Sequence, residues 1–454
     1  MTAVTIGSAT LHLGDCRDVL KTVADASIDA IVTDPPYELG FMGRDWNRSG
    51  VANDVAVWAE CLRVLKPGGH LLAFSGARTY HRMACAIEDA GFELRDQIMW
   101  IYGSGFPKSL DVSKAIDKAA GATRKVVGVK SVGNGNRKGE GFRHTGDAAG
   151  IPVTAPATEA AHQWDGWGTA LKPAHEPICV ARKPLVGTVA ANVLEHGTGA
   201  MNIDACRVPT DDKLGGGDQS AKTTVKTDGW DRPWMQDEAA KAAHAARVNA
   251  NVAKAEELGR WPANVIHDGS SEVLEAFAQF GEDKGQAARL GRRNSDKTRN
   301  TFGAFAGTAD ADFAPHDALG SAARFFYCAK ATRADRNEGL DDPGPQFKHG
   351  STLRDAENLG AERKGNHHPT VKPTDLMAYL CRLVTPPGGT VLDPFMGSGS
   401  TGKACAREGL RFVGVEQTPD YVEIARARIE YELERVAAEA AERDRQPDLF
   451  QETA

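Results

Sequence analysis

The sequence predicts an α/β protein built on one largely parallel, doubly wound sheet whose strands come from two separated parts of the chain. Near both ends, short apolar segments that stop at turn residues alternate with segments of helical periodicity. A long region rich in Gly, Asn and Asp separates the two parts. Each part alone is too small to close such a sheet, so we expect both to combine into one domain.

The first part contains four apolar runs that predict buried strands, at residues 9–13, 28–33, 70–75 and 98–102. Between them, Trp58, Leu62 and Leu65 recur at helical spacing. The Lys-Pro-Gly-Gly sequence at 66–69 predicts the end of that helix.

The last part predicts strands at 390–392 and 412–415, and residues 175–181 predict one more. A helix is expected at 402–408. Two more are predicted where apolar residues repeat every three or four positions, at Leu376, Tyr379, Leu380 and Leu383 and at Ile429, Leu433 and Val436. The prediction is therefore seven strands.

Composition sets broad limits. The chain has 454 residues, of which 41% are hydrophobic and 25% charged, as in a globular protein. The eight cysteines are scattered without a CxxC pair, which favours a reducing cytoplasm over disulfides or a zinc site. We see no secretion signal or membrane span. The net charge of −7 is a weak argument against nucleic acid, because a basic run lies at 284–299.

Four acidic residues each end or follow a predicted strand: Asp15, Asp34, Asp393 and Glu416. The carboxyl ends of parallel strands meet at one edge of a sheet, and ligands bind there. One acid at that edge is common. Four predict a binding site.

The first motif consists of Asp34, Pro35, Pro36 and Tyr37, directly after the apolar run at 28–33. The prolines make the loop rigid and leave its carbonyls pointing outward. A ring-conjugated amino group is a poor nucleophile, and the Asp34 carboxylate and the Pro35 carbonyl can each accept one of its N–H groups. Tyr37 offers a face on which a flipped-out base can stack. The alternative is a plain strand-terminating turn.

The second motif is a glycine-containing loop after the strand at 390–392. Its residues are Asp393, Pro394, Phe395, Gly397, Gly399, Ser400 and Thr401. The glycines let backbone N–H groups approach a ligand at the start of a helix, whose dipole favours an anion. Glu416, about twenty residues on, is suited to accept both ribose hydroxyls. NAD fits this spacing too, but no group nearby suits hydride transfer.

Together the Asp-Pro-Pro-Tyr and Phe-x-Gly-x-Gly sequences resemble the amino-methyltransferases of bacterial and phage DNA. The catalytic motif comes before the cofactor loop, as in the family's β group. The resemblance covers about residues 1–105, 171–183 and 365–435. It implies a Rossmann-like seven-stranded methyltransferase sheet, circularly permuted, with an inserted target-recognition region. It also implies S-adenosylmethionine as cofactor, and the Asp in first place implies adenine N6.

The resemblance divides the chain into four parts. They are a catalytic half at 1–183 with a mobile insertion at about 106–170, a target-recognition region at 184–364, a cofactor-binding half at 365–435 and an acidic tail at 436–454.

Cofactor contacts are expected from Asp34, from the glycine loop and from three further segments. These segments supply Asp15 and Cys16 for the adenine, Glu416 and Gln417 for the ribose, and Thr370, Lys372 and Pro373 for the methionine end. The resemblance places Thr370 and Lys372 toward the methionine carboxylate. His175 and Glu176 are interpreted as structural. No metal is expected, because methyl transfer from a sulfonium needs none.

DNA contacts are predicted at three places. Arg44 and Trp46 follow the catalytic loop and are predicted to form a flap over the flipped-out base. The alternative is that Trp46 only packs against that loop. Arg260, Trp261 and Asn264 suit base edges, or form a surface turn. The basic run that contains Arg292 and Arg293 is predicted to contact DNA phosphates. The alternative is that it is an ordinary solvent-exposed surface.

The predicted function is methylation of N6 of a flipped-out adenine in double-stranded DNA. The protein is expected to be bacterial or phage-encoded and to act in the cytoplasm. The alternatives are cytosine N4 or an RNA base as acceptor, a DNA-binding regulator with an inactive site, and a nicotinamide oxidoreductase. A homodimer and a cognate restriction endonuclease are the partners considered, and no membrane is expected.

Overall fold

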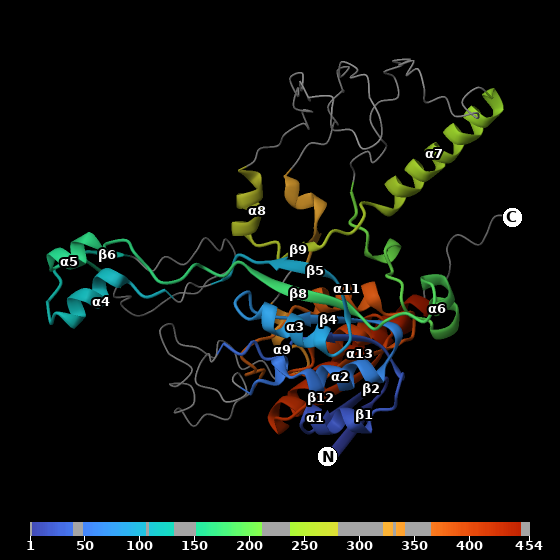
Figure 1. Ribbon diagram of the computed structural model, residues 1–454, viewed down its shortest axis with the longest axis horizontal. Helices are drawn as coiled ribbons and strands as arrows, with labels where there is room; N and C mark the ends of the chain where they lie inside the picture. Colours follow the sequence, from blue (N-terminus) through green and yellow to red (C-terminus); the bar gives the residue numbers. More distant parts are fainter. Residues whose placement is uncertain are drawn as a thin grey trace. The chain divides into compact units, whose positions relative to one another are not determined.

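The computed structural model (Figure 1) describes residues 2–39, 49–105, 109–130, 151–210, 237–279, 321–329, 333–340 and 365–445. The chain forms two compact units. One comprises Met1–Gly103 with His175–Ala454, and the other is Ser104–Ala174.

The larger unit contains one ten-stranded sheet in the order β1-β2-β12-β11-β3-β4-β8-β5-β9-β10. The strands are β1 (Thr2–Ile6), β2 (Ala9–Leu13), β3 (Ile28–Thr33), β4 (Leu65–Phe74), β5 (Glu93–Ile101), β8 (His175–Arg182), β9 (Val265–His267), β10 (Tyr327–Cys328), β11 (Thr390–Asp393) and β12 (Arg411–Glu416). Neighbours from β2 to β4 are parallel, whereas β8 is antiparallel to both β4 and β5.

The seven predicted strands are consecutive in this sheet, from β2 to β5. Strands β11 and β12, from the end of the chain, lie between β2 and β3, from its beginning. This confirms that the two α/β regions form one Rossmann-like sheet in permuted order.

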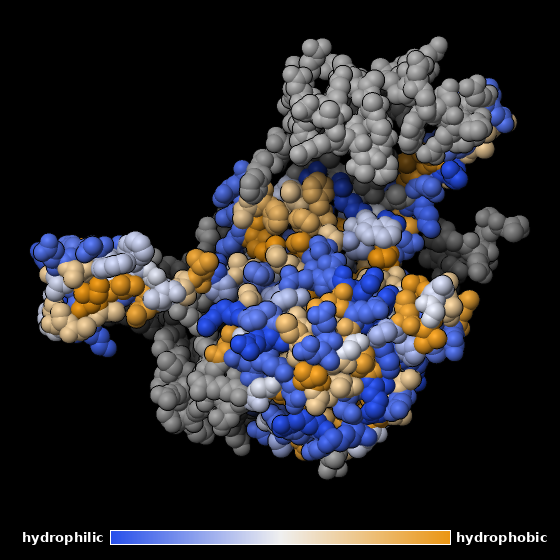
Figure 2. Space-filling model, in the orientation of Figure 1, coloured by the Kyte–Doolittle hydropathy of each residue, from blue (hydrophilic) through white to orange (hydrophobic). Residues whose placement is uncertain are grey.

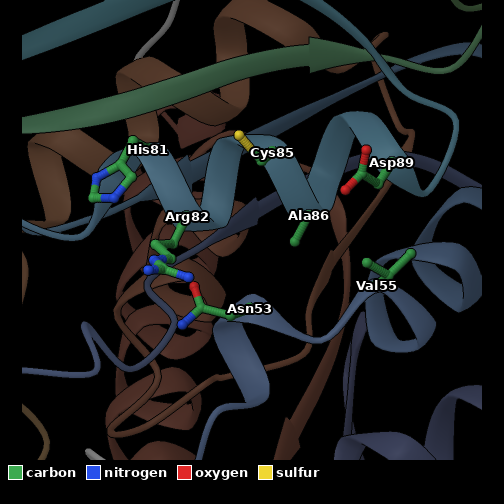
Figure 3. Close-up of a pocket in the computed structure, with 7 residues that line it drawn as sticks. All are labelled: Asn53, Val55, His81, Arg82, Cys85, Ala86 and Asp89. Carbon is green, nitrogen blue, oxygen red and sulfur yellow. The ribbon is translucent and has the colours of Figure 1, made fainter.

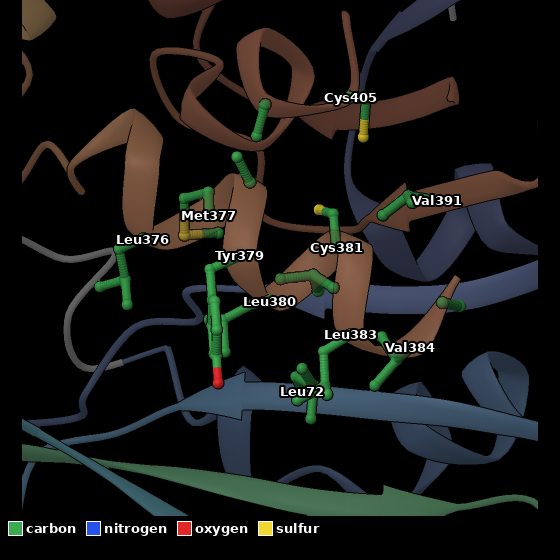
Figure 4. Close-up of a cluster of buried hydrophobic side chains, with 14 of the residues drawn as sticks. Leu72, Leu376, Met377, Tyr379, Leu380, Cys381, Leu383, Val384, Val391 and Cys405 are labelled. Atoms are coloured by element: carbon green, nitrogen blue, oxygen red, sulfur yellow. The ribbon is translucent and has the colours of Figure 1, made fainter. Parts of the chain in front are cut away.

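Helices cover both faces of the sheet. On one face are α1 (Cys16–Val19), α2 (Val55–Val64) and α3 (Tyr80–Asp89), and on the other are α11 (Thr374–Val384), α12 (Ser400–Arg407) and α13 (Pro419–Arg445). Successive residues of β4 alternate between the two cores: Leu71 and Ala73 pack on the first face, Leu72 and Phe74 on the second. Figure 4 shows α11 side chains facing Leu72 and Val391.

Three features differ from the prediction. The helix through Trp58 ends at Val64, and Leu65 begins β4, because it pairs with Ile28 of β3 and Pro67 cannot continue a helix. Three further strands widen the sheet, antiparallel β1 at one edge and parallel β9 and β10 at the other. Strands β9 and β10 come from the region assigned to target recognition.

Two helices were also underestimated. Helix α13 continues to Arg445, well into the stretch assigned as an acidic tail. Helix α7 (Glu238–Leu258) was not predicted, because its alanine-rich sequence has no apolar stripe. The described residues of the middle region also form the α-helices α6 (Val189–His196), α8 (Ser271–Ala278) and α9 (Arg333–Asn337).

The smaller unit, Ser104–Ala174, includes the residues for which an insertion at about 106–170 is predicted. It consists of α4 (Val112–Ala119), β6 (Val126–Lys130), β7 (Ile151–Thr154) and α5 (Glu159–Gln163), with β6 and β7 antiparallel. Its buried centre is Asp117, which accepts hydrogen bonds from Arg124 at 2.6 Å and from the Thr158 hydroxyl at 2.8 Å. The described parts of this insertion therefore have a fold of their own.

Hydrophobic surface gathers over α6 (Figure 2), where Val189 and Leu194 are exposed. In the part of the chain that the structure describes, no helix is both long and apolar enough to cross a membrane.

Candidate active site

The four acids lie at one edge of the sheet, as predicted. Asp15 follows β2, Glu416 ends β12, Asp393 ends β11 and Asp34 follows β3. These four strands are adjacent and parallel, so the acids form a row along their carboxyl ends.

Hydrogen bonds hold the Asp-Pro-Pro-Tyr loop at 34–37 from two sides. The Thr79 hydroxyl donates to the Tyr37 carbonyl at 2.7 Å. Lys372 Nζ donates to Asp34 Oδ2 at 2.6 Å and to the Tyr37 hydroxyl at 3.1 Å, and that hydroxyl donates to Glu176 Oε2 at 2.9 Å. The other Asp34 oxygen, Oδ1, is buried and has no hydrogen-bond partner among the described residues.

These contacts set the charge states. Burial alone lowers the pKa of Lys372, but the carboxylates of Asp34 and Glu176 outweigh it and raise the pKa above its usual value. Burial, with the same two carboxylates, raises the pKa of Tyr37 well above normal. Lys372 therefore stays an ammonium and Tyr37 a neutral phenol.

The glycine loop requires both of its glycines. Gly397 has φ +52° and Gly399 has φ +80°. A Cβ at Gly397 would lie 2.9 Å from Nε2 of His368, and one at Gly399 would lie 2.9 Å from the Cβ of Ala425. Any side chain at either position therefore adds both strain and a clash.

Asp393, at the end of β11, holds the glycine loop by hydrogen bonds. It is buried, and its oxygens accept from the hydroxyls of Thr33 at 2.6 Å and Thr401 at 2.5 Å and from Phe395 N at 3.0 Å. Burial raises the pKa of Asp393 to about 6. Ser400 and Pro394 are buried beside it. Asp393 thus joins β3, β11 and α12.

Glu416 and Asp15 complete the row. Glu416 accepts from Gly397 N at 3.1 Å and Thr418 N at 2.8 Å, and burial raises its pKa. Gln417 beside it is exposed. Asp15 caps α1 and pairs with Arg17 at 2.5 Å, and its hydrogen bond to Arg17 lowers its pKa. Cys16 is buried at the start of α1.

The segment at 368–373 lies along the site. His368 is next to Gly397, and burial lowers its pKa to about 4. Thr370 is exposed, Pro373 caps α11, and the ammonium of Lys372 contacts Asp34. The resemblance places Lys372 toward a cofactor carboxylate, which stays a prediction; the structure shows its ammonium on Asp34.

Only some predicted DNA contacts lie within the described residues. Arg44, Trp46, Arg292 and Arg293 lie outside them. The Arg260 guanidinium stacks 4.4 Å from the centre of the Phe325 ring. Trp261 is 63% exposed. Asn264 donates to Asp96 at 3.2 Å.

Two residues at the site carry contacts that the sequence did not predict. Glu176 was interpreted as structural, and because β8 is antiparallel, its first residues lie at the edge where the parallel strands end. Arg428 on α13 is fully buried and donates to Ser398 O, to Ser398 Oγ at 3.1 Å and to Asp335 O at 2.7 Å. An arginine within an apolar helical stripe was the available signal for it.

A separate surface pocket carries none of these residues. It lies along α3 (Figure 3) and is lined by Asn53, Val55, His81, Arg82, Cys85, Ala86 and Asp89. Nothing connects it with the row of acids, and we assign it no function.

Comparison with known proteins gives the family. The model of the DNA methylase family, N6_N4_Mtase, matches residues 28–427, which include both motifs. The chain belongs to this family.

Relatives of this DNA methylase match it over short stretches. It is 42% identical over 73 residues to the type II methyltransferase M2.DpnII of Streptococcus pneumoniae, covering 16% of this chain and 27% of that protein. It is 32% identical over 109 residues to the type II methyltransferase M.Cfr9I of Citrobacter freundii, covering 24% and 33%. The chain thus matches a third or less of the length of these relatives.

Among solved structures, the M1.HpyAVI–SAM complex aligns over 93% of this chain and 98% of that one, with 14% identity and a TM-score of 0.36. So weak a likeness adds nothing to the fold given by the strand order.

Proposed function

We propose that this DNA methylase transfers a methyl group from S-adenosylmethionine to N6 of a flipped-out adenine at a specific sequence in double-stranded DNA. The observation that carries the proposal is the loop at 34–37, beside the glycine loop of the neighbouring strand. There Asp34 offers a buried oxygen, Oδ1, that has no hydrogen-bond partner within the described parts of the chain.

The residues present fit the cofactor. Gly397 and Gly399 give the loop the positive φ angles and the close packing on His368 and Ala425 that its tight turn requires, and the loop leads into the start of α12. Glu416, at the end of β12, would hold the ribose, and Asp15 with Cys16 the adenine. Thr370 is the exposed member of the segment assigned to the methionine end. When bound, S-adenosylmethionine supplies a methyl group on a positively charged sulfur.

The chain's own residues position the acceptor. Asp34 Oδ1 and the Pro35 carbonyl accept the two N–H groups of the adenine amino group, which aims its lone pair away from the ring. Tyr37 stacks on the base. Asp34 takes up the proton only after the transfer, when that proton has become acidic, so positioning contributes more than basicity. Flipping the base costs a few kcal/mol, which contacts with the DNA offset.

DNA contacts are assigned to the surface around β9. The guanidinium groups of Arg260 and Arg324 lie 4.4 and 4.3 Å from the ring centre of Phe325, and that of Arg207 lies 5.1 Å from Trp261. Arginine side chains stacked on aromatic rings are suited to contact phosphate or base oxygens. A homodimer and a cognate restriction endonuclease are further proposals, testable by mass measurement in solution and by co-purification.

The test compares DNA from a bacterial host without its own methylation after expression of the wild type, Asp34→Ala or Asp25→Ala. Asp25 is a matched aspartate with an exposed side chain. Nucleoside mass spectrometry identifies the base, and long-read sequencing locates the site. We expect N6-methyladenine in one short motif with the wild type and Asp25→Ala only. N4-methylcytosine instead would move the acceptor, and no modified base would refute the proposal.

A further inference from the structure

Lys372 is shared between two carboxylates that belong to different strands. Its Nζ lies 2.6 Å from Asp34 Oδ2 and 3.3 Å from Glu176 Oε2. The Lys372 side chain is only 7% exposed, and its ammonium lies 4.9 Å from the centre of the Phe74 ring. With Tyr37, these side chains form a group whose members hydrogen-bond or pair with one another.

The two oxygens of Asp34 are unequal in this group. Oδ2 accepts from Lys372, whereas Oδ1 is buried without a hydrogen-bond partner among the described residues. A buried acceptor without a partner is unfavourable, so its persistence at the catalytic loop points to a substrate group. One ammonium cannot serve both oxygens of Asp34 while Glu176 holds it from another direction.

We propose that Glu176 is a positioning residue: it holds Lys372 on Oδ2 of Asp34, and so leaves Oδ1 free to accept the amino N–H of the substrate base. Glu176 acts through Lys372 and through the Tyr37 hydroxyl, which donates to it at 2.9 Å. The inference rests on the proposed function and adds a residue from β8 to the machinery of that site.

The proposal makes a specific claim about charge. Glu176→Gln keeps an acceptor for the Tyr37 hydroxyl but removes the negative charge that competes for Lys372. The ammonium then moves fully onto Asp34 and blocks Oδ1. Lys372→Met has a different effect, because it leaves Asp34 free to rotate. Both changes impair orientation of the acceptor nitrogen and leave the glycine loop and the DNA surface intact.

The experiment measures single-turnover methyl transfer by the full-length protein, with S-adenosylmethionine and a duplex containing the identified motif at saturating concentrations. We expect the rate constant to fall about 100-fold in Glu176→Gln and in Lys372→Met, as for other small misplacements of reacting groups. Dissociation constants for the cofactor, by calorimetry, and for the duplex, by fluorescence anisotropy, should change by no more than about threefold.

Lys66→Met is the matched control. Lys66 pairs with buried Asp29 at 2.6 Å, near the start of β3 and β4 and away from the carboxyl edge of the sheet. This variant also removes the ammonium partner of a buried aspartate, which keeps its hydrogen bond from Thr390 N at 2.7 Å. It therefore reports the effect of lost stability alone, and its rate constant should match the wild type below the melting temperature.

Each outcome decides the question. A normal rate in Glu176→Gln, an equal loss of rate in Lys66→Met, or a loss confined to cofactor or DNA affinity would each overturn the role of Glu176 while the proposed function stands. If the wild type transfers no methyl group to any duplex, the proposed function fails, and the role of Glu176 fails with it.

Discussion

Arg428 on α13 anchors the glycine loop, and its replacement by methionine is the sharpest test of how that loop is held. Its guanidinium is fully buried and donates to both oxygens of Ser398 and to the carbonyl of Asp335. Asn366 donates to the same Ser398 hydroxyl at 3.1 Å. Methionine fills similar space but can donate to none of these acceptors.

The expected loss follows from those contacts. Each buried acceptor left without a partner costs about 1–3 kcal/mol, and two of the three are backbone carbonyls. Burial lowers the pKa of Arg428 to about 10, so removing the charge returns part of that loss. We expect the free energy of unfolding to fall by about 3 kcal/mol in Arg428→Met. Looser holding of Ser398 should weaken cofactor binding roughly tenfold, which corresponds to about 1.4 kcal/mol.

Urea denaturation and calorimetric titration with S-adenosylmethionine measure the two effects. Arg426→Met is the control, because Arg426 lies on the same helix, is 46% exposed and makes only long ion pairs, at 3.9 and 4.0 Å. Its free energy of unfolding should change by less than about 0.5 kcal/mol. If the two variants are equally stable and bind the cofactor equally well, Arg428 does not hold the loop and the reasoning is wrong.

Three further predictions follow from single features. Gly399→Ala should abolish cofactor binding in calorimetry. Gly409→Ala, also at positive φ but with open space around it, should keep cofactor binding. Equal cofactor binding by the two variants would contradict the role of the glycine loop in holding the cofactor. Arg260→Ala should weaken DNA binding and lower the salt slope by about one, and an unchanged slope would remove Arg260 from the phosphate contacts. Burial lowers the pKa of His70 to about 4, so the unfolded chain binds the extra proton between pH 6.5 and 4 and stability falls as pH falls through that window. Between pH 7 and 5, the free energy of unfolding should fall by about 2 kcal/mol less in His70→Gln than in the wild type, as measured by urea titrations. If the free energy of unfolding depends on pH equally in both proteins, His70 is not the group responsible.

The sheet and its binding edge were predictable because they depend on local patterns. A strand buried on both faces is mostly apolar, as at Ile28–Thr33 with Asp29 as its charged residue, and an acid directly after such a run marks the carboxyl edge. The helix and strands that were not predicted lack such a pattern. Helix α7 is alanine-rich without a stripe, and β9 and β10 have only three and two residues.

The contacts of Glu176 and Lys372 were not predictable for a different reason. Both residues contact Tyr37, which is 139 and 335 residues away along the chain, and no local pattern reports such a contact. Only the direction of β8 contained the information. A strand that runs antiparallel begins at the edge where its parallel neighbours end, so the antiparallel direction places Glu176 in the site.

The same principle explains why the permuted order of the motifs does not disturb the site. Strands β3 and β11 are neighbours in the sheet although the chain separates them by most of its length. The Thr33 hydroxyl, at the end of β3, donates to Asp393, at the end of β11, at 2.6 Å across 360 residues of sequence. Because that buried contact fixes the end of one strand against the other, the catalytic loop and the glycine loop stay side by side. Strand order in the sheet, and not motif order in the chain, therefore determines the geometry of the site.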